Sequence, residues 1–476
     1  MATTVIGTRA LLELLGEWRD AGPSFHALAD RIRLLVIDGR VLSGVRLPAE
    51  RELAAQLGVS RTTVTAAYQR LRDQGFAVSR QGSGTRTALP GRAASPIAPV
   101  PGLLDFTKAA LPAPSMMQDA VRTASELLTP LLHDSGYDTM GLPVLREAIA
   151  RRYTERGLPT EADEVLVTVG AQQAIALIAR AMVSRGDRAL IEVPTYPHAY
   201  DAIKAAGARI VTAPVSIESK DGWDLAVLES VLRRTSPSVA YLMPDFQNPT
   251  GRSMSESLRR RVLEAAAAQG TVVVADETPA ELDIDRTGSF APLAAYSADA
   301  QVITIGSASK TMWGGLRVGW VRADRATIAR LHAVRATMDL GTPVFDQLVV
   351  ATLFESYDAV LAERRAALSA GRAAIESVVP EAFPDWDVPH VRGGLAAWVN
   401  IGAPVSSQLA LAARSEGLLV TAGPRFGVDG AFERYLRIPL TCSQTQVERA
   451  VAALQRAWPA ATRHPLPEPG VLAAVV

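Results

Sequence analysis

One short stretch near two-thirds of the chain combines a primary amine with two hydroxyls and a guanidinium. Lys310 stands just after Ser307 and Ser309, and Arg317 follows seven residues later. The chain contains 45 arginines but only four lysines, so a lysine at this position suggests a chemical role that arginine cannot fill. An ε-amine can deprotonate and form an imine with an aldehyde, which a guanidinium cannot do near neutral pH. Lys310 is therefore a Schiff-base candidate, and a solvated loop lysine is the alternative.

The groups around that amine suit a phosphate. Hydroxyls and a bidentate cation hold phosphate oxygens, which makes Ser307, Ser309 and Arg317 candidate ligands. A second anion site is expected further up the chain, where a glycine turn follows an apolar run and opens a helical segment. Free N–H groups and the helix dipole favour an anion at such a place, so Ala171 and Gln172 join the candidates. An ordinary connection between a strand and a helix is the alternative for this turn.

The elements that must position these groups alternate between apolar, strand-like runs and helical segments. The runs span 165–169, 189–193, 209–215, 239–243, 271–275 and 301–305. This alternation predicts an α/β fold with a mostly parallel sheet covered by helices on both faces. Sites in such sheets form at the carboxyl ends of the strands. Asp276 follows one run directly, where a carboxylate is costly unless it is paired, for example with a protonated ring nitrogen.

The charge of the first hundred residues differs from that of the rest. From Arg40 to Arg92 nine arginines stand against three acids, a net charge of 9 − 3 = +6. Because the formal net charge of the whole chain is zero, the remainder carries −6. A basic module ahead of an acidic body predicts a polyanion as the partner of this module alone.

The apolar spacing in this basic module predicts three short helices, with a tight turn at Gly58–Val59 between the second and the third. Ser60 suits the N-cap of the third helix. Arg61, Thr62 and Thr63 fall in its first turn, off the apolar face. In a recognition helix these positions reach base edges and phosphates, so the spacing indicates a helix-turn-helix.

A basic β-hairpin is expected after the third helix. Two short strands flank a glycine-containing turn, and they form a wing whose backbone N–H groups can approach phosphates closely. Arg80, Gly82, Ser83 and Gly84 are the candidate contacts in this wing. A basic helical domain that binds protein is the alternative to a DNA-binding module.

The motif L-P-A-E-R-E-L-A, followed by S-R-T-T-V and G-F-A-V-S-R-Q-G-S-G-T, resembles the GntR winged-helix family over about 65 residues. The resemblance implies that Arg51, Arg61, Thr63, Arg80 and Gly84 contact double-stranded operator DNA. With Ser60, Thr62, Gly82 and Ser83 they form the expected DNA-binding surface.

The lysine loop has the pattern S-x-S-K-x-x-x-x-G-L-R, and the segment 248–251 reads N-P-T-G. Both resemble motifs of fold-type I pyridoxal 5'-phosphate (PLP) enzymes, the aspartate aminotransferase superfamily. The resemblance implies that PLP binds Lys310, that Tyr196 stacks on its ring, that Asn248 donates to the ring oxygen and that Asp276 pairs with the pyridinium. A packed aromatic residue and a simple turn are the alternatives at positions 196 and 248.

Two further residues come from the same resemblance. Tyr137 is expected to reach the phosphate of the neighbouring subunit, unless it is an ordinary loop tyrosine. Arg437, in Y-L-R-I-P, is expected to bind the carboxylate of a substrate or effector through two parallel hydrogen bonds. An arginine on a half-exposed strand is the alternative there.

A GntR-like winged helix joined to an aminotransferase-like body resembles the MocR subfamily of transcription regulators. The resemblance implies a homodimer with PLP at the subunit interface, and a DNA-binding head of one subunit near the body of the other. The expected domains are a helical extension (1–22), the winged helix (23–88), a linker (89–103) and the PLP-binding domain (104–476). The last includes a smaller C-terminal subdomain at about 340–460.

One position departs from the family pattern. The family usually has a tyrosine two residues after the pyridinium-binding aspartate, and here Thr278 stands in that place. We therefore expect a regulator that senses PLP or an amino-containing effector through Schiff-base chemistry rather than an efficient enzyme. A working aminotransferase with a DNA-binding head is the alternative.

Composition limits the remaining possibilities. A single cysteine, Cys442, excludes an internal disulfide, and the six scattered histidines show no ligand spacing, so no metal is expected. No apolar run approaches the roughly 18 residues of a membrane span, and the start lacks the basic region of a signal peptide. The expected location is the cytoplasm, on the nucleoid when the protein is bound to DNA.

Overall fold

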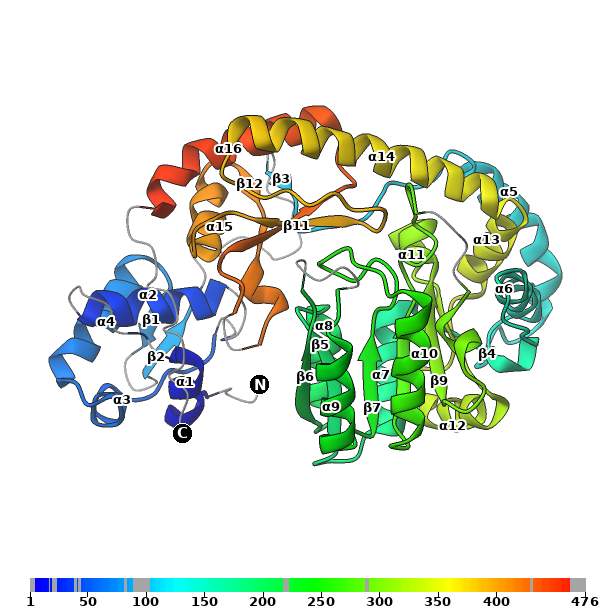
Figure 1. Ribbon diagram of the computed structural model, residues 1–476, viewed down its shortest axis with the longest axis horizontal. Coiled ribbons are helices and arrows are strands. Elements are labelled where there is room, and N and C mark those ends of the chain that lie inside the picture. Colours follow the sequence, from blue (N-terminus) through cyan, green and yellow to red (C-terminus); the bar gives the residue numbers. More distant parts are fainter. Residues whose placement is uncertain are drawn as a thin grey trace.

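The chain folds into a small N-terminal head and a larger α/β body (Figure 1). The computed structural model describes residues 5–16, 18, 24–37, 41, 44–80, 84–88, 103–216, 222–286, 291–428 and 431–462. In that part of the chain no helix is both long and apolar enough to cross a membrane.

The head has the expected winged helix-turn-helix form. Its elements are α1 (Thr8–Leu15), α2 (Ser24–Ile37), α3 (Glu50–Leu57), α4 (Arg61–Asp73), β1 (Ala77–Arg80) and β2 (Gly84–Thr87). Gly58 ends α3 in the left-handed conformation (φ 64°), which glycine adopts without strain. Ser60 caps α4, because its hydroxyl accepts a hydrogen bond from the Thr63 N–H at 3.1 Å. The strands β1 and β2 pair antiparallel and form the wing.

A seven-stranded sheet in the order β4-β10-β9-β8-β7-β5-β6 forms the centre of the body. Its strands are β4 (Val165–Thr168), β5 (Arg188–Val193), β6 (Arg209–Pro214), β7 (Val239–Leu242), β8 (Val272–Asp276), β9 (Val302–Ser307) and β10 (Gly319–Arg322). The sheet is mostly parallel, as predicted, and the six expected runs are all strands. The strand β10 is antiparallel to both neighbours, β4 and β9, and was not expected from the sequence.

Side chains of each buried strand alternate between the two faces of this sheet. Along β7, Val239 and Tyr241 pack on one face, whereas Ala240 and Leu242 pack on the other. The first face is covered by α7 (Gly170–Met182), α8 (Pro197–Ala205) and α12 (Arg325–Arg335). The second is covered by α9 (Leu225–Thr235) and α10 (Glu256–Ala267).

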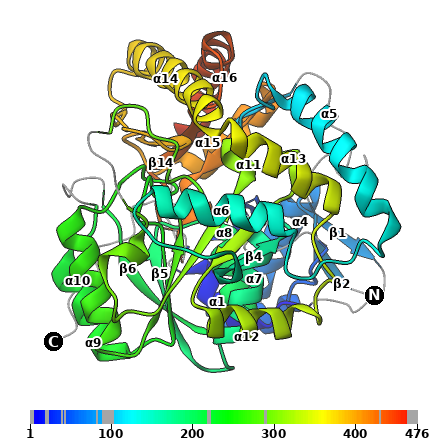
Figure 2. The same ribbon diagram turned by 90° about the vertical axis from the view of Figure 1, so that its right-hand side faces the viewer.

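A further helical layer lies beside β4 and consists of α5 (Met117–Leu128), α6 (Pro143–Glu155) and α13 (Val344–Glu355) (Figure 2). The long helix α14 (Tyr357–Ala382) runs from this layer to the small subdomain (Figure 1). Short 3-10 helices complete the body: η1 (Thr129–His133), η2 (Ala162–Glu164), η3 (Leu293–Tyr296), η4 (Gly314–Leu316) and η5 (Gly423–Phe426).

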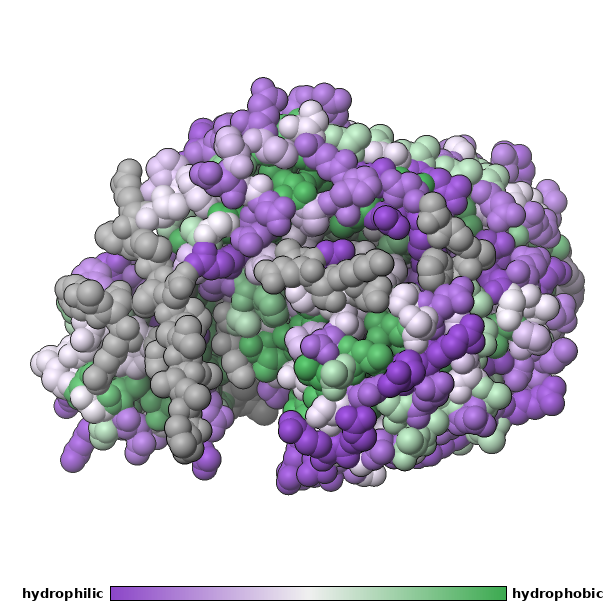
Figure 3. All heavy atoms as spheres, viewed as in Figure 1, coloured by the Kyte–Doolittle hydropathy of each residue, from purple (hydrophilic) through white to green (hydrophobic). Residues whose placement is uncertain are grey.

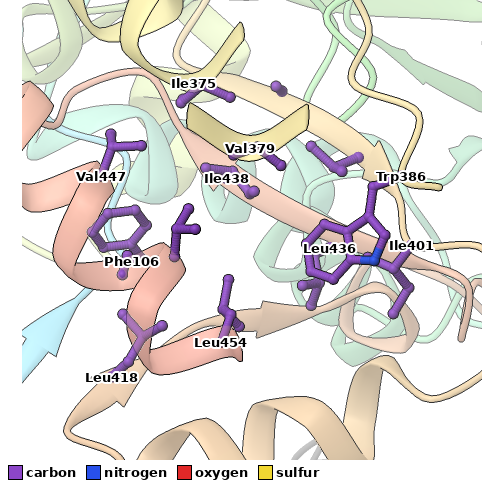
Figure 4. Close-up of a cluster of buried hydrophobic side chains, with 14 of the residues drawn as sticks. Phe106, Ile375, Val379, Trp386, Ile401, Leu418, Leu436, Ile438, Val447 and Leu454 are labelled. Carbon is purple, nitrogen blue, oxygen red and sulfur yellow. The ribbon is translucent and has the colours of Figure 1, made fainter. Parts of the chain in front are cut away.

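The small subdomain packs a three-stranded sheet against helices. Its elements are β11 (Ala396–Asn400), β12 (Leu418–Leu419), β13 (Thr421–Ala422), β14 (Tyr435–Pro439), α15 (Ser406–Ser415) and α16 (Gln444–Thr462). In its core Leu436 and Ile438 of β14 lie among apolar side chains of α14 and α16, beside Trp386 (Figure 4). The strand β12 also pairs with β3 (Leu104–Asp105), so the start of the body is tied to this subdomain.

The head rests on the small subdomain of its own chain. Helix α2 contacts α15, and Leu411 of α15 packs against the apolar core of the head. In Figure 1 the head accordingly lies beneath α15. On the same face of the molecule, hydrophilic side chains predominate and hydrophobic ones gather in patches near the centre (Figure 3). The expected placement of a head near the body of a second subunit stays a prediction.

Candidate functional site

A cavity of about 190 Å³ opens between the carboxyl ends of the central strands and the small subdomain. Ten of the residues singled out from the sequence line it: Ala171, Gln172, Tyr196, Asn248, Asp276, Ser307, Ser309, Lys310, Arg317 and Arg437. They come from five segments of the large part and one strand of the small subdomain. The fold therefore brings together groups that are up to 266 positions apart in the chain, from Ala171 to Arg437.

Lys310 lies on α11 (Ala308–Thr311), a single helical turn directly after β9. Its amine donates to the Ala109 carbonyl at 3.0 Å. Burial, together with the charges of Arg437 and Arg317, lowers the pKa of Lys310 to about 8, while the charge of Asp276 opposes the shift. An amine with this pKa is partly deprotonated near neutral pH, which is the form that attacks an aldehyde.

Arg317 and the first turn of α7 meet at one end of the cavity. The Arg317 guanidinium donates to the Ser309 hydroxyl at 3.2 Å and to the Val169 carbonyl at 3.4 Å. Gly170 opens α7 with φ 76°, and a side-chain Cβ there would collide with Arg317. Because the first N–H groups of a helix have no partner within that helix, this end offers an anion both a cation and backbone donors.

The two other candidates at this end are bonded to the protein itself. The Ser307 hydroxyl donates to the Val318 carbonyl at 3.3 Å and accepts from the Ser309 N–H at 3.1 Å. The Gln172 amide donates to the His198 carbonyl at 3.1 Å, and its buried Oε1 has no hydrogen-bond partner. Ser307 thus stabilises the turn that carries Lys310, and Gln172 retains one side-chain acceptor without a partner.

Asp276 ends β8 at the floor of the cavity and is 2% exposed. Tyr241 donates a short hydrogen bond to its Oδ2, and the Thr278 N–H donates to Oδ1 at 3.0 Å. Burial and the charge of Asp276 raise the pKa of Tyr241 well above its ordinary value, so that phenol keeps its proton. Both carboxylate oxygens are therefore held in fixed directions.

Glu192 is a buried carboxylate that the sequence did not indicate, and its hydrogen bonds connect two of the segments around the cavity. Glu192, at the end of β5, is fully buried. It accepts hydrogen bonds from Trp223 Nε1 at 3.0 Å, from the Met243 N–H at 3.1 Å and from Gln247 Nε2 at 3.3 Å. Burial raises the pKa of Glu192, whereas these three N–H donors oppose the rise and favour the carboxylate form.

Gln247 extends this connection to the turn that bears Asn248. Its Nε2 also donates to the Pro194 carbonyl at 2.6 Å, two residues before Tyr196, and its Oε1 accepts from the Thr250 hydroxyl at 2.7 Å. The segments that carry Tyr196 and Asn248 are thereby fastened to one buried acceptor. The signal in the sequence was a lone Glu inside an apolar run, which does not reveal its partners.

Arg437 of β14 reaches the cavity from the small subdomain. Its guanidinium donates to the Thr107 carbonyl and lies 5.2 Å from the ring centroid of Phe426. The Nε atom is buried and has no hydrogen-bond partner. Burial lowers the pKa of Arg437 to about 10, although Tyr196, in its ionised form, and the Asp105 carboxylate oppose this shift. The side chain is 9% exposed and has no carboxylate partner among the described residues.

Tyr137 lies outside the cavity of its own chain. It is 73% exposed, on the loop before α6. Its expected role in a neighbouring subunit therefore stays a prediction.

The predicted DNA contacts form a separate, exposed surface on the head. Arg51, Ser60, Arg61, Thr62 and Gly84 are exposed, and Thr63 is half-buried. Ser60 and Thr63 bond to each other as part of the helix cap described above, so these two hydroxyls position the start of α4. The Arg61 side chain is 72% exposed, 4.0 Å from Glu50.

In the wing, Arg80 pairs with Gly84 across the hairpin. Gly84 has φ 78°, and a Cβ at this position would lie 2.9 Å from Arg46 Nε. Gly82 and Ser83 lie outside the described residues.

The head and the body of the chain match two different protein families. Residues 109–454 match the family of class I and II aminotransferases, and residues 26–86 match the gntR family of bacterial regulatory proteins. The solved structure of LysN, an α-aminoadipate aminotransferase from Thermus thermophilus complexed with N-(5'-phosphopyridoxyl)-L-leucine, is similar with a TM-score of 0.67. It is 30% identical and covers 75% of this chain and 92% of that chain.

Two regulators are similar to the chain as well. The HTH-type transcriptional regulator TauR of Rhodobacter capsulatus is 28% identical over 449 residues, 86% of this chain and 90% of TauR. The probable rhizopine catabolism regulatory protein MocR of Rhizobium meliloti is 30% identical over 336 residues, 64% of this chain and 66% of MocR. The chain belongs to the class I and II aminotransferase family, and its head matches the gntR family of bacterial regulatory proteins. The two regulators named above are similar to it over more than the length of the aminotransferase part, for TauR, and over most of that length, for MocR.

The cofactor of this family is PLP, and the cavity fits it. The cavity offers a primary amine, a buried carboxylate and an arginine beside a helix N-terminus, the groups that an aldehyde, a pyridinium and a phosphate require. The Oε1 atom of Gln172 and the Nε atom of Arg437 are buried and have no hydrogen-bond partner, so each can still form a hydrogen bond with a ligand.

Proposed function

We propose that this protein regulates transcription by binding operator DNA through its head, and that its body senses a small amine-bearing effector, or PLP itself, in the cavity around Lys310. The observation that carries the proposal is the pairing of an exposed basic recognition surface with a cavity whose amine has a pKa of about 8. On DNA the protein would lie on the nucleoid.

In this proposal PLP supplies an aldehyde that reacts with amines and a ring that withdraws electrons. Lys310 provides the amine of the protein, and the effector amine competes with it. Arg317, Ser309 and the N–H groups of Ala171 and Gln172 would hold the phosphate. Asp276, fixed by Tyr241 and Thr278, would keep a proton on the ring nitrogen.

The remaining residues would hold the ring in place. Tyr196 would pack against the ring, and Asn248 would donate a hydrogen bond to its oxygen. The Glu192–Gln247 connection fixes the segments that carry both residues.

Sensing rather than turnover is supported by Thr278. A threonine at this half-buried position offers no phenol to the ring oxygen, and its N–H is already bonded to Asp276. Sensing needs only a difference in ligand affinity between two conformations, whereas catalysis needs groups placed for proton transfer.

A homodimer is part of the proposal. Large hydrophobic residues are exposed on α5, on η1 and on two adjacent segments: Leu127, Leu132, Tyr137, Met338 and Leu340. Gly341 packs on the backbone of Asp138, so the last two segments lie side by side. An exposed apolar patch of this kind supports a subunit contact. Tyr137 would then reach the cavity of the partner subunit.

The test is to purify the full chain with PLP, to select its operator from random DNA, and to measure operator affinity with and without PLP. We expect a yellow protein whose affinity for the selected operator depends on PLP. Sequence-independent DNA binding that PLP does not alter would contradict the proposal.

A second function, PLP-dependent transamination, is favoured by one observation. The Lys310 amine is partly deprotonated near neutral pH, so it could move a proton as a catalytic base. Formation of keto acid at about one turnover per second or faster, with no effect of any amino acid on operator binding, would establish this function in place of sensing.

A further inference from the structure

The amino ends of β5 and β6 carry an exposed group of cations, which we call the basic edge. Three segments meet there, at residues 180–188, 204–209 and 233–238. The Gly186 N–H donates to the Gly207 carbonyl at 2.9 Å, and the Arg188 guanidinium donates to the Thr235 carbonyl at 3.2 Å. The exposed cations of the basic edge are Arg180, Arg185, Arg188, Lys204, Arg209, Arg233 and Arg234.

The charge of the basic edge is opposite to that of the body around it. Its three segments contain seven cations and one acid, a net charge of 7 − 1 = +6. The acid is Asp187, which accepts a hydrogen bond from the Ser184 N–H at 2.8 Å. Because the chain outside residues 40–92 carries −6, the residues outside both basic regions carry −6 − 6 = −12. A local reversal of sign of this size produces a field that attracts a polyanion.

The helix dipole accounts for only part of the basic edge. Four of its cations lie in the last turns of α7, α8 and α9, where a positive charge is favourable. The other three are Arg185, Arg188 and Arg209, which lie outside helices. Arg188 and Arg209 are direct neighbours across β5 and β6, and like charges at such positions repel each other. None of these three forms an ion pair with a described carboxylate, so an external anion would relieve the repulsion.

The basic edge lies on the side of the body that is nearest the head. The strand β6 is the last strand of the central sheet on this side. In Figure 1, β6 and α9 form the border of the body that faces the head, and the basic edge lies at the lower end of this border. Hydrophilic side chains cover this lower end in Figure 3. DNA that extends from the head past this border would meet the basic edge, whereas the cavity opens at the opposite ends of the strands.

We propose that the basic edge is a second DNA-binding surface, which contacts the phosphates of the double-stranded DNA that flanks the operator. This inference rests on the proposed function of the head. Neighbouring strands lie about 4.8 Å apart, and a duplex carries one negative charge per about 1.7 Å of its axis, so several exposed arginines can reach phosphates at once. Contacts of this kind add affinity but no sequence preference.

The test uses two duplexes that carry the same operator, selected from random DNA, and the full-length protein loaded with PLP. The short duplex ends at the operator, and the long duplex extends about 30 base pairs, roughly 100 Å, beyond each side. We expect the slope of log affinity against log salt to be steeper by about three on the long duplex, because each neutralised phosphate contributes about 0.9. Equal slopes on the two duplexes would overturn the inference.

A double variant assigns this difference to the basic edge. Arg185→Gln/Arg209→Gln should lower the difference in slope to about one and leave affinity for the short duplex unchanged, which also shows that the variant folds. The matched control, Arg260→Gln/Arg449→Gln, removes the same charge from exposed positions of α10 and α16 and should keep the full difference. A difference that persists in the first variant, or that disappears in the control, would also overturn the inference.

The remaining outcomes separate this inference from the proposed function. Without operator binding on either duplex, the regulator hypothesis and this inference both fail. Operator binding with equal slopes retains the regulator and refutes only the role of the basic edge. The alternative partner is an acidic protein. Binding of poly-L-glutamate that Arg185→Gln/Arg209→Gln weakens, with no effect of duplex length, would identify that partner and overturn the inference.

Discussion

The head and the cavity use the same kinds of residues in opposite settings. On the head, Arg61 and its neighbours face solvent, and the apolar core beneath them supports the helix that carries them. Around the cavity, Asp276 and Glu192 are buried and bonded to other side chains and to backbone N–H groups. Exposed contacts are expected to contribute almost independently, whereas buried networks act as units. A single change should therefore remove one contact from the head but disturb several around the cavity.

The largest effect expected is that of Lys310→Ala, which should abolish the visible band of the PLP-loaded protein, because no other primary amine lines the cavity among the described residues. Lys204→Ala is the control, since Lys204 lies at the exposed end of α8 and its amine contacts Tyr200. Absorption spectra before and after borohydride report the result. A band of normal intensity in Lys310→Ala, or its loss in Lys204→Ala, would contradict the assignment.

The pH dependence of PLP uptake tests the same amine. The folded-state pKa of Lys310 is lowered from 10.5 to about 8, so the protonated form predominates below pH 8 and the free amine above it. The rate of PLP uptake by the apoprotein should rise about tenfold per pH unit up to pH 8 and then level off. Stopped-flow absorbance measures this rate. A rise that continues unchanged to pH 10 would show that the amine is not perturbed.

On the head, Arg61→Ala should weaken operator binding by about 10- to 100-fold if Arg61 reads a base, and should then relax sequence preference at that position. If it contacts a phosphate, binding should weaken on all sequences and the slope of log affinity against log salt should fall by about one. Arg122→Ala is a matched control, because both side chains are 72% exposed and Arg122 lies on α5 of the body. Equal affinity of the two variants would contradict a role for Arg61.

Glu192→Gln tests whether the buried network acts as a unit. Three N–H donors surround Glu192, and an amide would point its own NH2 group at one of them. The segments bearing Tyr196 and Asn248 should shift, and PLP should bind about tenfold more weakly. Glu264→Gln, at a 66% exposed position of α10, should change nothing. Dialysis followed by absorbance measures retained PLP, and unaltered retention in Glu192→Gln would show that the network does not position the site.

The smallest effect expected is that of Gly84→Ala in the wing. Its positive φ and the nearby Arg46 should cost about 1 kcal/mol, which moves the wing slightly and weakens operator binding a few-fold. Gly7→Ala, with φ −68° and open space around the new Cβ, is the control. Thermal unfolding and a binding assay compare the two, and indistinguishable variants would mean that the wing tolerates the change.

The sequence was informative wherever neighbouring residues decide the structure. The cap at Ser60, the stop at Gly58 and the alternation of apolar runs with helices follow from local conformational preference and burial, and all were predicted. Lys310 could be singled out because it is one of only four lysines, Asp276 because it directly follows an apolar run, and Arg317 because it is a cation close to that amine in the sequence.

Contacts between distant segments could not be predicted in this way. The strand β10 is short and antiparallel, and its pairing with β4 depends on residues more than 150 positions away. The donors to Glu192 stand 31 to 55 positions further along the chain. Nothing in the local pattern around Leu411 indicates that α15 supports the head.

One strand joins the two regions. Glu433, just before β14, accepts hydrogen bonds from Ser407 at the start of α15, and the charge of Arg31 on α2 of the head acts on it. Arg437 stands on β14, four positions after Glu433, which lies in the turn that precedes the strand.

The β14 strand is paired with β11 on one side and with β13 on the other, so Arg437 is held firmly within this sheet. We expect that a ligand which displaces Arg437 also displaces the turn that precedes the strand, and with it the contact between α15 and the head.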